Sequence, residues 1–177
     1  MSQPDYDKLK NIRMLALDVD GVLTDGGIYL NDLGQETKRF FVRDGLGIRI
    51  AQKADIQIAA ITGRVSRSVA MRLAELEIKL VRDGVKNKAE AIKALAELAN
   101  VTLEEIAYVG DDLIDLPAMR LAGYSFAVAD ASGAVIEACD HVTTQRGGNG
   151  AVREVIEHLL KSQGKWDQIV DQYRNMT

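Results

Sequence analysis

Short apolar runs alternate with longer segments of helical period along this chain, and this alternation restricts the possible fold more than any other feature. The short runs predict strands at Met14 to Leu17, Ile56 to Ile61, Ile78 to Val81, Ile106 to Val109, Ser125 to Val128 and, more weakly, His141 to Thr143. Repeated strand–helix–strand units form a parallel sheet with helices on both faces. We therefore predict an α/β fold with a doubly wound parallel sheet.

The segments between the predicted strands have the apolar spacing of amphipathic helices. A helix is predicted over residues 87–99, and Asn100 is suited to end it. Its apolar stripe consists of Ala91, Ile92, Leu95 and Leu98.

One stretch departs from the alternation directly after the first strand. Ile28 to Asn31 and Thr37 to Val42 have strand character and flank a turn at residues 31–34, a pattern that predicts a β-hairpin. We expect this hairpin, residues 27–42, to be an insert that projects from the sheet.

Length and composition predict one domain. A chain of 177 residues with 47% hydrophobic residues can bury a sizeable core, and no repeat or Pro/Gly-rich linker marks an internal boundary. We predict a single domain over residues 1–177. Its polar tail at 164–177 is expected to be either frayed or docked on a partner subunit.

Charge, cysteine usage and hydropathy limit the partners and the location. A formal net charge of -4 disfavours nucleic acid, because binding a phosphate backbone requires a concentrated excess of Lys and Arg. Cys139 is the only cysteine, so no internal disulfide can form, and no apolar run is long enough to cross a membrane. We expect a soluble protein of the reducing cytoplasm with neither a nucleic-acid nor a membrane partner.

Polar residues that can perform chemistry follow three of the predicted strands. They are Asp18 and Asp20, then Thr62-Gly63-Arg64, then Gly110-Asp111-Asp112. Ligands of open α/β sheets bind outside the carboxyl ends of the strands, so we expect these groups to converge. Converging carboxylates repel one another without a cation, and Mg²⁺ binds oxygen ligands and bridges to phosphate oxygens. The sequence predicts a Mg²⁺ site at this edge.

These residues resemble, in order, the four motifs of the haloacid dehalogenase superfamily. The matching residues are Asp18-Val-Asp-Gly-Val-Leu-Thr-Asp25, Thr62, Lys88 and Gly110-Asp-Asp-Leu-Ile-Asp115. The resemblance runs through nearly the whole chain. It implies a Rossmann-like haloacid dehalogenase fold and a Mg²⁺-dependent phosphatase that forms an aspartyl-phosphate.

The resemblance also implies a role for each matching residue. Asp18 is the nucleophile, and Asp20 is the general acid and later the general base. Mg²⁺ is held by three groups: Asp18, the main-chain carbonyl of Asp20, and Asp111. Phosphate oxygens are bound by Thr62 and the N–H of Gly63, while Lys88 offsets the charge that builds up during transfer. The remaining acidic residues, Asp112 and Asp115, orient Lys88 or metal-bound water.

Individual residues also have structural interpretations. An Asp at a strand end is often a helix cap or turn former, and this stays open for Asp112 and Asp115. A helix lysine is usually solvated. The order of the motifs favours a catalytic role for Lys88 and prefers it to Lys86.

The intervals between the motifs are too short for a cap domain. Only the hairpin fills the first interval, and residues 63–88 hold one helix and one strand. An active site open to water selects substrates poorly, so we expect a neighbouring subunit to cover it. This layout, with Arg43-Asp-Gly-Leu-Gly-Ile48 and Arg146-Gly-Gly-Asn-Gly-Ala-Val-Arg-Glu154, resembles the 3-deoxy-D-manno-octulosonate 8-phosphate phosphatase family. Members of that family form homotetramers and act in lipopolysaccharide precursor biosynthesis.

The family resemblance implies a substrate with a phosphate at one end and a sugar-acid carboxylate at the other. Arginine pairs with carboxylate through two hydrogen bonds, so Arg64 and Arg72 are predicted to bind it, with Arg49 a further candidate. The segment after the hairpin is predicted to present backbone groups to a ligand across a subunit boundary, from Phe41, Val42, Arg43, Asp44 and Gly45. Each arginine also has a plain interpretation as a solvated surface residue.

Three other functions stay open. A 2-keto-3-deoxynonulosonate 9-phosphate phosphatase resembles this chain in all four motifs but typically has Glu where this chain has Arg64. A response-regulator receiver domain also has an acidic Mg²⁺ site, but its acidic pair is adjacent, whereas Val19 separates Asp18 from Asp20. A catalytically silent oligomerisation domain would not need the complete set of motif residues.

Overall fold

A parallel sheet forms the centre of the computed structural model, which describes residues 6 to 175. Among these residues its six strands lie in the order β5-β4-β1-β6-β7-β8, and all neighbouring pairs are parallel. Their bounds are β1 Met14–Asp18, β4 Gln57–Ile61, β5 Leu80–Arg82, β6 Ile106–Gly110, β7 Tyr124–Ala127 and β8 His141–Val142. The predicted doubly wound α/β fold is confirmed. Positions 1–5 and 176–177, the ends of the predicted domain and tail, lie outside the described residues.

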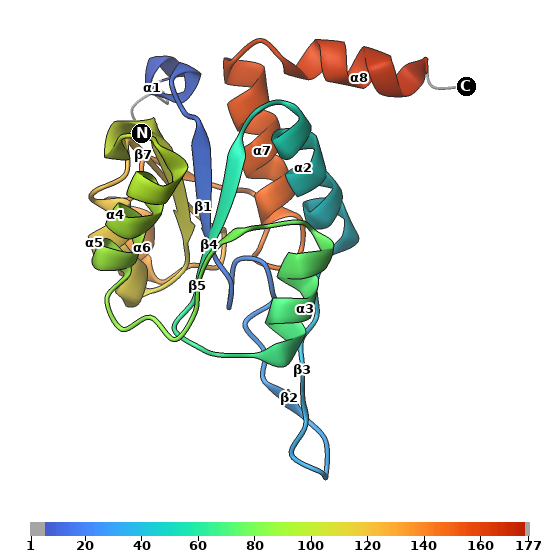
Figure 1. Cartoon of the computed structure of the whole chain (residues 1–177), viewed down its shortest axis with the longest axis vertical. Coiled ribbons are helices and arrows are strands. Elements are labelled where there is room, and N and C mark those ends of the chain that lie inside the picture. The colour runs from blue at the N-terminus through green and yellow to red at the C-terminus, as the bar shows by residue number, and fades with distance from the viewer. Residues whose placement is uncertain (1–5, 176–177) are drawn as a thin grey trace.

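Helices cover both faces of this sheet (Figure 1). One face carries α2 Val42–Lys53, α3 Arg67–Glu75 and α7 Ala151–Ser162. The other carries α4 Lys88–Ala99, α5 Leu116–Met119 and α6 Gly133–Ala138. The remaining described helices are α1 Tyr6–Lys10, α8 Trp166–Arg174 and the short 3₁₀ turns η1 Leu103–Glu105 and η2 Leu113–Asp115.

The sheet has a hydrophobic core on each face, and the central strand β1 contributes to both. Its side chains alternate between faces, so Leu15 and Leu17 pack with α2 and α7, while Met14 and Ala16 pack with α4. Because both faces are covered, every residue of the strand is buried, and Met14 to Leu17 form a continuous apolar run. Asp18, its last residue, lies at the middle of the carboxyl edge of the sheet, between β4 and β6.

The predicted helix at residues 87–99 is confirmed as α4. Its cap is Asn87, whose side chain accepts hydrogen bonds from the backbone N–H groups of Ala89 and Glu90. Asn100 ends the helix in the left-handed conformation, at φ 54°. The prediction that Leu98 belongs to the buried stripe is wrong, because it is 63% exposed.

The predicted hairpin is present, but its second strand is shorter than expected. β2 Tyr29–Leu30 pairs with β3 Glu36–Thr37, and the hairpin projects away from the sheet (Figure 1). The strand predicted to run from Thr37 to Val42 ends at Thr37, since Val42 already begins α2. Between them, Phe40 forms an isolated bridge with Thr24 in the loop after β1.

The layout around the sheet agrees with the prediction that there is no cap domain. Within residues 6–175, β1 and α2 are separated by the hairpin, and β4 and α4 by α3 and β5. The tail is helical over α8, with Trp166 and Ile169 partly buried against the core. Its docking on a partner subunit stays a prediction. In the described part of the chain, none of the helices combines the length and apolar character needed to span a membrane.

Candidate active site

A buried lysine lies between two buried carboxylates at the carboxyl edge of the sheet. Asp18, which is 3% exposed, accepts a hydrogen bond at Oδ1 from the N–H of Val19 at 2.7 Å. The Nζ atom of Lys88, the first residue of α4, lies 2.8 Å from the same oxygen. Lys88 Nζ also donates to Asp115 Oδ1 at 2.6 Å. The first residue of α4 therefore places a positive charge beside the carboxyl end of β1.

Asp115 is fully buried and accepts hydrogen bonds at both oxygens. Oδ1 accepts from the Tyr108 hydroxyl at 2.7 Å, and Oδ2 accepts from the N–H groups of Asp111 and Asp112 at 3.1 and 3.3 Å. Asp115 thus orients Lys88, as expected. Asp112 instead fits the structural interpretation, because its exposed side chain caps η2 by accepting from Leu113 N–H.

Asp18, Asp111 and Asp115 form a cluster of negative charge. Each offers a carboxylate oxygen, and these oxygens lie within 4.8 Å of one another. Burial, reinforced by the neighbouring Asp115, raises the pKa of Asp18 to about 6, despite the opposing charge of Lys88. Burial and the charges of Asp18 and Asp115 raise the pKa of Asp111 to about 8.

This cluster fits a hard divalent cation. One lysine offsets only part of the charge of three carboxylates, and a cation bound among them would replace the protons that the raised pKa values favour. Asp115 is already engaged in four hydrogen bonds, so the carboxylates of Asp18 and Asp111 are the ones placed to hold the cation. Oxygen-only donors match Mg²⁺.

The loop after β1 is shaped to admit Asp111. Gly21 has φ +87°, and a Cβ atom there would lie 2.0 Å from Asp111 Oδ2. The buried hydroxyl of Thr24 accepts from the N–H groups of Gly21 and Gly26, each at 3.3 Å. Against the same loop packs Gly147, whose added Cβ would lie 1.6 Å from the Gly21 carbonyl oxygen. The sequence analysis missed the role of Thr24, although it lies inside the first motif.

The carboxylate of Asp20 is not part of this cluster and faces the hairpin. It accepts a hydrogen bond from Lys38 Nζ, and its Oδ2 lies 3.4 Å from the Thr62 hydroxyl. Thr62 is buried and accepts from Arg64 N–H at 3.1 Å. Lys38 was also missed by the sequence analysis. The signal that could have pointed to it is the charged pair Glu36 and Lys38, which stand two residues apart at the end of the hairpin.

The three predicted substrate arginines lie in different places. Arg64 pairs with Glu36 of the hairpin, next to the site. Arg72, on α3, lies 6.0 Å from the Phe40 ring, and an added Cβ at Gly45 would meet its guanidinium at 2.3 Å.

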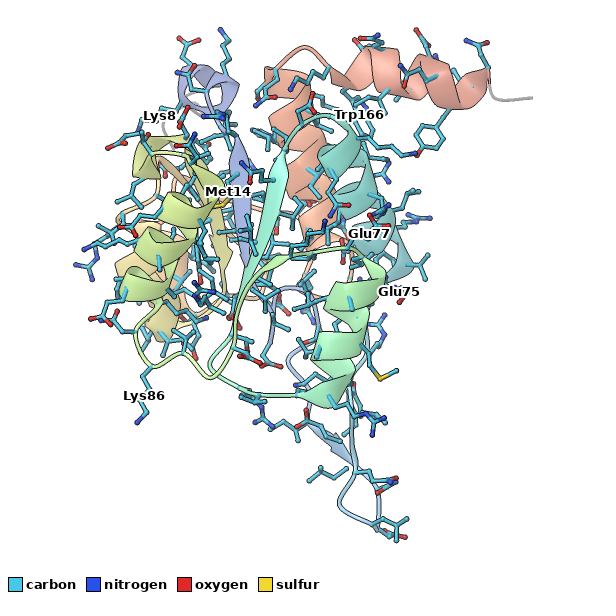
Figure 2. The ribbon with its side chains drawn as sticks, viewed as in Figure 1. Lys8, Met14, Glu75, Glu77, Lys86 and Trp166 are labelled. Carbon is cyan, nitrogen blue, oxygen red and sulfur yellow. The ribbon has the colours of Figure 1, made fainter. Side chains whose placement is uncertain are left out.

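Arg49 is paired away from the acidic cluster of its own subunit, and its contact with substrate stays a prediction. Its guanidinium is 2.9 Å from Glu77 and donates to the Leu76 carbonyl. Leu76 and Glu77 follow the last residue of α3, at the end of this helix that lies farther from the hairpin. Figure 2 shows Glu77 there. Arg49 lies away from the cluster because α2 runs away from the carboxyl edge of the sheet from Val42 onward (Figure 1).

The segment 41–45 is the start of α2, and its members differ in role. The buried carboxylate of Asp44 accepts from the Gly150 and Arg153 N–H groups at 3.2 and 2.8 Å and so caps α7, while the contact of its backbone with a neighbouring subunit's ligand stays a prediction. Val42 is 79% exposed. Phe41 and Arg43 line an open hollow of about 550 Å³ beside the start of α7. Gly63 is exposed in the loop after Thr62, as a phosphate-binding N–H requires.

Comparison with known proteins decides the family. A family model described as haloacid dehalogenase-like hydrolase matches residues 78–156. The 3-deoxy-D-manno-octulosonate 8-phosphate phosphatase of Escherichia coli K12 is 52% identical over 91% of this chain and 86% of that protein. This chain belongs to the 3-deoxy-D-manno-octulosonate 8-phosphate phosphatase family. The haloacid dehalogenase fold that the motifs implied is thereby confirmed.

Solved structures similar to this chain have been determined with ligands. The Moraxella catarrhalis phosphatase, in complex with magnesium, phosphate and the KDO molecule, has a TM-score of 0.92 and 42% identity, covering 95% of this chain and 97% of that one. The cobalt-bound Haemophilus influenzae phosphatase has a TM-score of 0.88 and 48% identity, covering 90% and 93%. The family thus has structures with a divalent metal and with the sugar acid.

Proposed function

We propose that this chain is a Mg²⁺-dependent phosphatase that hydrolyses 3-deoxy-D-manno-octulosonate 8-phosphate to 3-deoxy-D-manno-octulosonate and phosphate. The observation that carries the proposal is the Asp18 carboxylate, held 2.8 Å from Lys88 beside Asp111, in a chain 52% identical to an enzyme named for this reaction. A phosphoryl group bound there meets a nucleophile, a fixed positive charge and a set of cation ligands at once.

The reaction takes two steps on this chain's own residues. A carboxylate oxygen of Asp18 attacks phosphorus, the ester P–O bond breaks, and Asp20 gives its proton to the leaving sugar oxygen. Water then attacks the aspartyl-phosphate and passes its proton to Asp20, and the P–O bond to Asp18 breaks to release phosphate. Asp20 ends each cycle protonated, as it began.

The surrounding groups have distinct roles in this proposal. Asp18, Asp111 and the main-chain carbonyl of Asp20 would hold Mg²⁺, which when bound offsets the negative charge of the phosphoryl group. Thr62 and the N–H of Gly63 bind phosphate oxygens. Lys88, held by Asp115, balances the charge on the transferring group.

The substrate carboxylate is assigned to Arg64 and Arg72, with Phe41 and Arg43 beside it. Arg64 forms an ion pair with Glu36 of its own chain. A substrate carboxylate can take the place of the Glu36 carboxylate in this pair. The presence of arginine at position 64, where the nine-carbon enzymes typically have glutamate, favours the eight-carbon substrate.

The experiment is phosphate release from a substrate panel. Purified protein is assayed on octulosonate 8-phosphate, nonulosonate 9-phosphate and simple sugar phosphates, with Mg²⁺ and with EDTA. We expect the highest kcat/KM on the eight-carbon ester and no turnover in EDTA. Full turnover without metal would overturn the mechanism, and preference for the nine-carbon ester would overturn the substrate assignment.

We further propose a homotetramer of the cytoplasm, formed through the hairpin. The hairpin exposes Ile28, Leu30 and Leu33 at 57%, 64% and 81%, and exposed apolar clusters mark protein interfaces. The neighbouring subunit covers a site that has no cap of its own. A cytoplasmic location fits the lone Cys139.

The test is the mass of the assembly in solution. Leu30→Asp with Leu33→Asp is expected to give monomers or dimers and to raise KM. Leu98→Asp, which charges an equally exposed leucine on α4, is expected to leave the tetramer intact. A wild-type chain that sediments as a monomer would refute this assembly.

A further inference from the structure

Lys38 has its charged group buried at the base of the hairpin. Its side chain is 1% exposed, although β3, which precedes it, is partly or fully exposed. Its Nζ donates a hydrogen bond to Asp20 Oδ1 and lies 3.6 Å from Glu36 Oε1. A lysine is almost never fully buried unless it is paired, so the position of Lys38 depends on these two carboxylates.

The two residues after Lys38 attach this segment to the loop that carries Asp20. Arg39 donates to the carbonyl of Gly148 at 3.0 Å, and Phe40 forms a β-bridge with Thr24. Both Gly148 and Thr24 belong to or pack on the loop after β1. The Lys38 backbone is therefore fixed relative to that loop, and its ammonium group reaches Asp20 from a preorganised position.

The two oxygens of Asp20 have different surroundings. Oδ1 is held by Lys38, whereas Oδ2 lies 3.4 Å from the hydroxyl of Thr62. Thr62 is the residue assigned above to the phosphate oxygens. Holding Oδ1 on the hairpin side leaves Oδ2 on the side where the phosphate ester binds.

We propose that Lys38 is a positioning residue, which fixes Asp20 so that Oδ2 delivers the proton to the leaving oxygen. In this step the Asp18–phosphorus bond forms and the ester P–O bond breaks. The O–H bond of Asp20 breaks at the same time, and its proton goes to the leaving oxygen. The inference rests on the proposed function, because it needs Asp20 to be the general acid. Lys38 itself touches neither phosphorus nor the leaving group.

A positioning role predicts a dependence on the leaving group. A sugar alkoxide is a poor leaving group and needs the proton, whereas p-nitrophenolate leaves without one. General acid catalysis contributes about 10² to 10⁴-fold. The parameter to compare is kcat/KM, because it reports phosphoryl transfer to Asp18 and excludes the later hydrolysis step, in which Asp20 acts on both substrates alike.

The experiment compares the wild type with Lys38→Met, Lys38→Arg and the control Lys93→Met, which removes an exposed lysine on α4. Each is assayed on octulosonate 8-phosphate and on p-nitrophenyl phosphate. Lys38→Met is expected to lower kcat/KM about 10² to 10³-fold on the sugar phosphate and less than about 5-fold on the aryl ester. Lys38→Arg should recover part of the loss, and Lys93→Met should match the wild type.

An equal loss on both substrates would show that Lys38 only maintains the fold of the loop, and no loss would show that it does not hold Asp20; either result overturns the proposal. A comparison with Asp20→Asn supplies a second measurement, which remains informative if Lys38→Met weakens the fold. Adding Lys38→Met to Asp20→Asn should cost nothing further on the sugar phosphate, since both act through one group. If Lys38→Met does not fold, Lys38→Gln takes its place.

Failure of the proposed function is distinguishable from failure of this inference. If the wild type prefers another alkyl phosphate, the substrate assignment falls, and the comparison of alkyl with aryl ester is made on that substrate. A wild type that hydrolyses no phosphate ester would overturn both.

Discussion

Lys88 is the residue on which the buried charge of the site depends. It lies 2.8 Å from Asp18 and 2.6 Å from Asp115, and all three are buried. Removing one partner from such a group leaves an uncompensated charge in a medium that solvates it poorly. The same poor solvation strengthens the interaction of Lys88 with a transferring phosphoryl group.

Replacing Lys88 by Met is expected to lower kcat about 10² to 10³-fold, because the charge on the transferring group loses its fixed counter-charge. The matched control is Lys86→Met, which removes an exposed lysine two residues earlier that points away from the molecule in Figure 2. Steady-state kinetics on the preferred substrate measure both. Similar losses in the two variants would reassign the motif lysine.

Asp18→Asn removes the nucleophile while keeping the shape of the side chain. We expect kcat to fall by about 10⁴-fold or more, and no phosphorylated protein to be trapped by rapid acid quench during turnover. The oligomeric state should be unchanged. Substantial residual turnover with a trapped phosphoprotein would assign the phosphoryl group to another residue.

At the scale of elements, α2 and α7 are joined through one carboxylate. Asp44, in the first turn of α2, accepts from the N–H groups of Gly150 and Arg153 at the start of α7. The N-terminal N–H groups of a helix lack intrahelical partners, so Asp44 acts as a cap from another element. Burial raises the pKa of Asp44 to about 6, even though both backbone hydrogen bonds favour the charged form.

The raised pKa of Asp44 gives a stability prediction with a definite sign. A carboxyl group whose pKa rises from 3.8 to about 6 on folding stabilises the protein fully below about pH 4, and this contribution is lost as pH rises through 6. Between pH 4.5 and 7.5 the wild type should lose about 2 kcal/mol of unfolding free energy relative to Asp44→Asn, which cannot ionise. Asp44→Ala should be about 1 to 2 kcal/mol less stable than Asp44→Asn at both pH values. Urea unfolding measures both differences, and parallel pH profiles would contradict the first.

At the scale of the whole molecule, the acidic cluster makes the folded state sensitive to metal. The carboxylates come from β1 and from the turn after β6, and the loop carrying Gly21 and the Gly147 segment close around them. Folding therefore concentrates negative charge that the unfolded chain spreads out. A cation that binds only the folded chain offsets this cost.

The melting temperature should report this sensitivity of the folded state to metal directly. The pKa values of Asp18 and Asp111 are raised to about 6 and about 8, so in EDTA the stability they contribute is lost as pH rises from 4 to 8. Mg²⁺ binds the deprotonated groups, and its stabilising effect should therefore grow over the same range. Asp111→Asn should be more stable than the wild type in EDTA at pH 8 and should gain less from Mg²⁺. A Mg²⁺ effect independent of pH would contradict the assignment of these ligands.

The amino-acid sequence by itself determined the sheet and the chemistry of its edge. A buried parallel strand appears in the sequence as an apolar run, and a helix between strands appears as an apolar period of 3.6 residues. The residues that follow each apolar run must meet at one edge of the sheet. All of these patterns can be recognised from neighbouring residues in the sequence. They located the six strands, α4 with the Asn100 that ends it, and the positions of Asp18, Thr62 and Asp111, whereas Lys88 was predicted from the order of the family motifs.

The tertiary structure decided which polar residues touch. Asp44 and Arg49 have the same local appearance as ligand-binding residues, but Asp44 caps a helix more than 100 residues away in sequence and Arg49 pairs with Glu77. Lys38 has no motif, and its contact with Asp20 exists because the hairpin folds back onto the loop after β1. Side-chain pairing between distant segments depends on the whole chain path, which no local spacing records. The sequence thus predicted the catalytic groups, while folding determined how they are held.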